Sequence, residues 1–131
     1  MATLKSTLKI ESTDIFPTPV NFTQINNNPV NGNFSGFNTL DVPANSLQKL
    51  NFLSTIDATG AYVYIQSAST NSHPVYVGAG SVSITTSTIK LYAGDIAFFP
   101  AGDSNGSFDL GAICAAGQTG TITYFIGEKS L

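Results

Sequence analysis

The chain lacks arginine and tryptophan, and it has only five lysines, one histidine and one cysteine among 131 residues. Charged residues make up 10% of the sequence, against roughly 25% in an ordinary soluble domain. Binding to a phosphate backbone depends on clustered Lys and Arg, and the net charge here is -3. We therefore expect no nucleic-acid partner.

Long apolar runs are also missing. None approaches the roughly eighteen residues that a membrane-spanning helix needs, so we expect no membrane association. Lys5 and Lys9 interrupt the start of the chain, which argues against a secretion signal. The single cysteine, Cys114, cannot form an internal disulfide, as is typical of proteins assembled in a reducing cytoplasm.

Small polar residues take the place of charge: the chain has 15 Thr, 14 Ser and 11 Asn. Together with Val, Ile, Tyr and Phe, these residues favour strands and turns over helices. Apolar and polar residues alternate in LKSTLKIE (4–11), whereas AYVYIQ (61–66) is apolar on both faces and predicts a central strand. Turn signals such as Asn31-Gly32 and Gly94-Asp95 separate nine or ten such runs.

This pattern predicts an all-β fold: a single-domain antiparallel β-sandwich over residues 1–131, jelly-roll-like, with residues 1–11 as an extended N-terminal strand or arm. An immunoglobulin-like sandwich has a similar pattern. INNNPVNGNFSGF (25–37) is rich in Asn and Gly and predicts a long loop with an edge strand, and DSNGS (103–107) predicts a second exposed loop. We expect partner contacts at residues 1–11 and 25–37.

Residues that carry chemistry are few and isolated. His73 precedes a proline in NSHPV and has no second His nearby, so we interpret it as a loop residue rather than a zinc ligand. Cys114 lies in the apolar segment GAICAA and is interpreted as a small buried hydrophobe rather than a nucleophile. Asp95 follows Gly94 at a turn, where a short carboxylate can accept backbone N–H bonds.

The carboxylates are scattered along the chain, and no two of them stand out as a glycosidase pair. They are Glu11, Asp14, Asp41, Asp57, Asp95, Asp103, Asp109 and Glu128. The sequence contains no nucleophile elbow, dinucleotide-binding fingerprint or P-loop. We therefore predict no catalytic residue, no metal ligand and no cofactor, and hence a protein that is not an enzyme.

The most informative string is LYAGDIAFFPAG (91–102), in which a Gly-Asp turn leads into an apolar run that ends at Pro-Ala-Gly. It resembles the second conserved motif of cupins, which implies a buried strand in a jelly-roll-like sandwich. The cupin metal ligands are missing, because Asp103, Ser104 and Asn105 occupy the place of the last expected His. The resemblance therefore supports the fold and not cupin catalysis.

Three segments together resemble small structural proteins of tailed bacteriophages, particularly those of cyanobacterial and marine phages. They are MATLKSTLKIESTD (1–14), LYAGDIAFFP (91–100) and TITYFIGEKSL (121–131). The resemblance assigns no functional residue. It implies a non-enzymatic virion protein, such as a capsid decoration or cement protein assembled in the host cytoplasm.

The partners expected from that resemblance are further copies of the chain, with a trimer favoured, and the major capsid protein. Low charge limits repulsion between crowded copies, and spare aromatic residues can serve interfaces. Two alternatives stay open: a carbohydrate-binding or adhesive β-sandwich of a phage tail or fibre, and a degenerate cupin-like protein.

Overall fold

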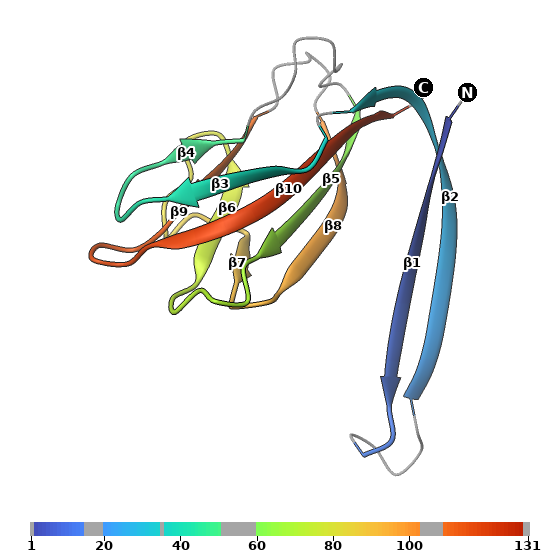
Figure 1. Ribbon diagram of the computed structural model, residues 1–131, viewed down its shortest axis with the longest axis horizontal. Helices are drawn as coiled ribbons and strands as arrows, with labels where there is room; N and C mark the ends of the chain where they lie inside the picture. The colour runs from blue at the N-terminus through green and yellow to red at the C-terminus, as the bar shows by residue number, and fades with distance from the viewer. Residues whose placement is uncertain (1, 15–19, 35, 51–59, 103–108, 130–131) are drawn as a thin grey trace.

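The structure, a computed structural model, describes residues 2–14, 20–34, 36–50, 60–102 and 109–129, which form strands and no helix (Figure 1). No helix that could cross a membrane is present in this part of the chain. The strands are β1 (Ala2–Ser12), β2 (Val20–Phe34), β3 (Asn38–Val42), β4 (Gln48–Lys49), β5 (Ala61–Ser67), β6 (Val75–Ala79), β7 (Ile89–Leu91), β8 (Ile96–Ala101), β9 (Leu110–Ile113) and β10 (Gly120–Lys129).

The strands form two antiparallel sheets. One sheet has the order β1-β2-β10-β5-β8, and β3 also pairs with β10 in this sheet. The other sheet has the order β4-β9-β6-β7. Buried side chains from both sheets meet in one core, so the predicted all-β sandwich is confirmed. The jelly-roll connectivity stays a prediction.

The core contains mainly β-branched residues on alternating positions of the strands. Val63 and Ile65 of β5 and Ile122 of β10 are fully buried, and they face Val75 and Val77 of the other sheet within one cluster. The predicted central strand at residues 61–66 is confirmed, because β5 lies between β10 and β8. Its Tyr62 and Tyr64 alternate with the core residues and lie on the outer face of the sheet.

Strands β1 and β2 form a long hairpin that projects from the sandwich (Figure 1). Their register is continuous from Ala2↔Val30 to Ser12↔Val20, and only two residue pairs join β2 to β10, Gly127↔Phe34 and Lys129↔Val30. The predicted arm, residues 1–11, thus lies almost entirely in β1.

The prediction of a long loop with an edge strand at residues 25–37 is wrong. Most of this segment lies in β2, which pairs with β1 on one side and with β10 on the other, so it is not an edge strand either. Asn residues that suggested turns are accommodated within the hairpin: the Asn28 side chain donates to the carbonyl oxygen of Leu4 and to the Ser6 hydroxyl, at 3.2 and 3.1 Å. The Asn31-Gly32 signal lies where the register between β2 and β10 shifts, not in a turn.

The cupin-like motif implied a buried strand, and this expectation is also wrong, because the strand is partly exposed. The turn and strand are present, but β8 pairs only with β5 among the described strands, and Ile96 and Phe98 are exposed. Pro100 is accommodated within β8, opposite Tyr62, because an edge strand does not need every backbone donor. The predicted loop at residues 103–107 lies outside the described residues.

Candidate functional site

The hairpin is amphipathic, with its charge confined to one face. Directly opposed residues of an antiparallel pair share a face, and here Ile10 is opposite Phe22 and Leu8 is opposite Gln24. This face, called the apolar face of the hairpin, contains only uncharged residues: Leu4, Ser6, Leu8, Ile10, Ser12, Val20, Phe22, Gln24, Asn26, Asn28 and Val30. Lys5, Lys9 and Glu11 alternate with them and lie on the other face.

Large side chains on the apolar face lack cover from the described residues. Leu8, Ile10 and Phe22 are each about half exposed. Strand β1 pairs only with β2 among the described strands, so its outer edge is open along the hairpin. A two-stranded hairpin is marginally stable in water unless something packs on it.

Aromatic rings cover the outer face of β10, β5 and β8. The ring of Phe37, which precedes β3 and is 74% exposed, lies 5.5 Å from that of Phe125 and 6.2 Å from that of Tyr64. Tyr62 stacks on Phe98 with the ring centres 6.0 Å apart. With the exposed Ile96, these five rings form what is called the aromatic face.

The two faces adjoin where the hairpin meets the sheet. Val30 is opposite Lys129, whose ammonium nitrogen lies 5.5 Å from the centre of the Tyr62 ring. Val30 is fully buried but is not part of the sandwich core, which shows that the junction between hairpin and sheet is packed. The apolar face of the hairpin therefore meets the sheet at Val30, next to Lys129 at the margin of the aromatic face.

A second feature is an open pocket of about 570 Å³ at the other end of β10. It is lined by the end of β3, the loop between β5 and β6 and the segment before β10: Asp41, Val42, Pro43, Thr70, Asn71, Ser72, His73, Gly117, Thr119, Gly120 and Thr121. Asp41 accepts a hydrogen bond from the Thr121 hydroxyl at 3.1 Å. The lining includes hydroxyl, amide, carboxylate and imidazole side chains, and it contains no Phe or Tyr.

The individual predictions for His73 and Asp95 agree with the structure. His73 is exposed in the bend before β6, as expected of a loop residue. Asp95 accepts a hydrogen bond from the backbone N–H of Tyr92 at 2.9 Å, while Gly94 adopts a φ of 81° that favours glycine. Asp95 thus stabilises the turn into β8, as predicted.

Cys114 is fully buried within the core, and burial raises the pKa of its thiol. We expect iodoacetamide to alkylate Cys114 about 100-fold or more slowly in the native protein than in urea, because the thiolate is the reactive form. The Cys114 thiol of the unfolded chain loses its proton at a lower pH than that of the folded chain. The free energy of unfolding is therefore expected to fall as the pH rises above the thiol pKa of the unfolded chain, near about 8.5. Equal alkylation rates in the two states would contradict the burial.

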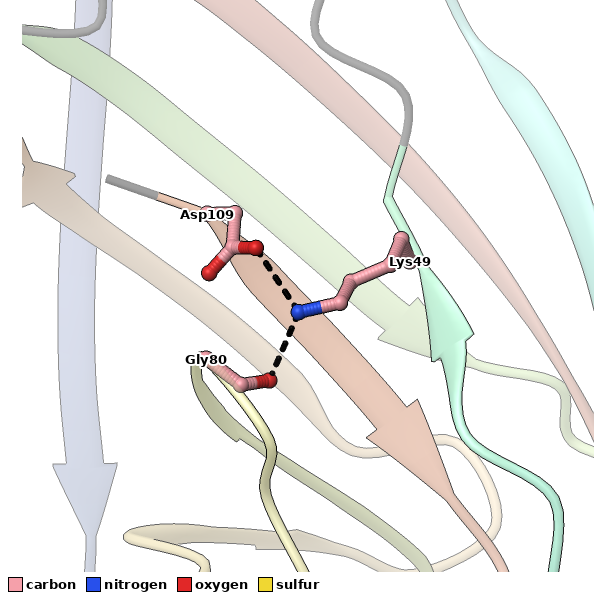
Figure 2. A network of polar contacts seen from close by, with 3 residues as sticks. All are labelled: Lys49, Gly80 and Asp109. Carbon is pink, nitrogen blue, oxygen red and sulfur yellow. Dashed lines mark hydrogen bonds and ion pairs between the residues drawn. The ribbon is translucent and has the colours of Figure 1, made fainter. Parts of the chain in front are cut away.

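The carboxylates that the structure describes form no candidate metal site. No group of three or more His, Cys, Asp and Glu occurs among the residues that the structure describes. Asp109 instead binds Lys49 of β4 at 2.7 Å, and the same ammonium donates to the carbonyl oxygen of Gly80 at 3.0 Å (Figure 2). Both side chains are about half exposed, so this pair joins β4 to β9 with a stabilisation of at most about 1 kcal/mol.

Comparison with known proteins does not add to this geometry, since no protein-family model, curated protein or solved structure matches the chain. The sequence predicted partner contacts on residues 1–11 and 25–37, most of which lie in the hairpin. It missed the apolar face of the hairpin and the aromatic face of the sandwich, although Val20 and Phe22 alternate with polar residues in the sequence. It also missed the pocket, whose Asp41 and His73 are far apart in the chain.

Proposed function

We propose that this chain is a non-enzymatic structural protein of a bacteriophage virion, a capsid decoration protein that stabilises the shell. The observation that carries the proposal is the exposure of two uncharged surfaces, the apolar face of the hairpin and the aromatic face of the sandwich. A surface of this kind suits permanent association, because aromatic side chains are enriched and charges are depleted at the centre of interfaces.

The mechanism is mechanical. Each copy contributes weak contacts, and repetition over many copies makes the attachment strong, since every contact after the first is effectively intramolecular. The scarcity of charge supports this role because it limits repulsion between neighbours on a crowded shell.

The assignment to a phage is supported by the three segments that resemble tailed-phage structural proteins. In the structure they correspond to β1, to the Gly94 turn with β8, and to β10. Strands β8 and β10 contribute Phe98 and Phe125 to the aromatic face.

The proposal is tested on particles produced from the genome that encodes the chain. Mass spectrometry of purified particles should find the chain in many copies, and gold-labelled antibodies should mark the head. Absence of the chain from particles would refute the proposal. Labelling confined to the tail tip would replace decoration by host attachment.

The pocket beside His73 favours one alternative, a carbohydrate-binding domain of a phage tail or fibre. Its hydroxyl and amide groups offer hydrogen-bond partners to a sugar, although no Phe or Tyr ring is part of that lining. A glycan array with the purified chain tests this function. Binding that Asp41→Ala abolishes would support it, and an array without hits would exclude it for the glycans displayed.

A further inference from the structure

We propose that the apolar face of the hairpin packs on the aromatic face of a second copy of this chain. The inference rests on the proposed function in one respect, that the hairpin is an assembly element, and it adds the partner and the surface that receives it. Three observations carry it: the matched chemistry of the two faces, the surface area and the reach of the hairpin.

The two faces are chemically matched. The apolar face of the hairpin presents Leu8, Ile10 and Phe22 without a charged neighbour on the same side. The aromatic face presents the exposed side chains of Phe37, Phe98 and Ile96. A lysine, Lys129, lies next to this face, and its ammonium group is over the Tyr62 ring. Contact between these faces of two copies buries aliphatic side chains against aromatic rings and leaves Lys5, Lys9 and Glu11 in water.

The chain exposes more surface than a compact monomer does, and this surplus is comparable to one side of an ordinary interface. The chain exposes 7544 Å², whereas a compact monomer of its mass exposes about 6,600 Å². The excess, roughly 900 Å², is close to the area that one partner buries in a standard protein–protein interface, about 800 Å². The surplus surface is therefore of the size that contact with a second copy would bury.

The hairpin also has sufficient reach. Eleven residues of β1 extend about 35 Å, comparable to the diameter of a sandwich of about 100 residues. Figure 1 shows the hairpin directed away from its own sandwich rather than folded against it. Exchange of such arms between copies, by a two-fold or around a three-fold axis, gives a closed oligomer in which every arm is covered.

The first experiment measures mass by native mass spectrometry and light scattering. We expect the wild-type chain to form a closed oligomer and Ile10→Asp to raise its dissociation constant about 30-fold or more. The matched control is Ile25→Asp, because Ile25 is 50% exposed against 51% for Ile10 but lies on the opposite face of the hairpin. This control should change the constant less than about threefold.

A monomeric wild-type chain at tens of micromolar would overturn the inference, as would equal effects of Ile10→Asp and Ile25→Asp. A second measurement does not depend on the folding of charged variants. Chains carrying only Leu8→Cys are mixed with chains carrying only Phe98→Cys and oxidised, while the buried Cys114 is left in place.

We expect a disulfide-linked pair of one chain of each kind, and none when Ile25→Cys replaces Leu8→Cys. A chain with both Leu8→Cys and Phe98→Cys that links only to itself would show intramolecular closure and overturn the inference. Chains that incorporate into particles without cross-linking would refute this contact and leave the proposed function standing. Cross-linking by a chain that is absent from particles would support the contact and refute the function.

Discussion

Replacement of Ile122 by alanine is expected to lower the free energy of unfolding by about 2–5 kcal/mol. Ile122 is fully buried in β10, where it lies opposite Leu40 of β3 and Ser67 of β5. Loss of three methyl or methylene groups leaves a cavity that the surrounding strands cannot close, because they are fixed on both sides by backbone hydrogen bonds. Urea denaturation followed by tyrosine fluorescence measures the change.

The control for this substitution is Ile84→Ala, because Ile84 is exposed in a turn. We expect it to change the free energy of unfolding by less than about 0.5 kcal/mol. All measurements need one protein concentration, since association makes apparent stability depend on concentration. An equal loss for the two variants would mean that Ile122 does not lie in a packed core.

Replacement of Asn71 by alanine is the second large effect, with an expected loss of about 2–3 kcal/mol. The Asn71 amide nitrogen donates to the Ser67 hydroxyl and to the Thr121 carbonyl oxygen, both at 2.8 Å, and its oxygen accepts from the Thr121 N–H at 2.9 Å. Three hydrogen bonds from one side chain thus hold the β5–β6 loop against the start of β10. Alanine leaves the buried Ser67 hydroxyl and the Thr121 N–H without this partner.

Asn21→Ala, at an exposed position of the hairpin, provides the comparison and should be nearly neutral. Hydrogen exchange of the Thr121 amide gives a readout local to the contact, and we expect it to accelerate in Asn71→Ala. A loss of stability below about 0.5 kcal/mol together with unchanged Thr121 exchange would contradict the assigned role.

The parts of the fold that were predictable depend on local patterns. Alternation over residues 4–11 and the doubly apolar run at residues 61–66 identified strands, because side-chain period and burial are properties of the segment itself. The Asp95 turn was predictable for the same reason, since the donor of its hydrogen bond is only three residues away.

The errors concern properties that depend on distant pairing. Residues 25–34 form a strand because β1 and β10 pair with them, and this outweighs the turn preference of Asn and Gly. The exposure of β8 follows from its place at the sheet edge, which the composition of the strand does not specify. The apolar face of the candidate site requires the register between β1 and β2, and neither strand contains that information alone.

The contact between β2 and β10 is small, with two residue pairs, and this affects how cooperatively the chain unfolds. The core cluster, as far as the structure describes it, contains only residues from Leu40 onward, so none of the described hairpin side chains belongs to it. We therefore expect hairpin and sandwich to behave as separate cooperative units, with the hairpin opening while the sandwich stays folded. Under the proposed assembly, ordering of the hairpin is part of the free energy of association. We then expect the amide protons of β1 and β2 to exchange faster in the free chain than in the assembled one.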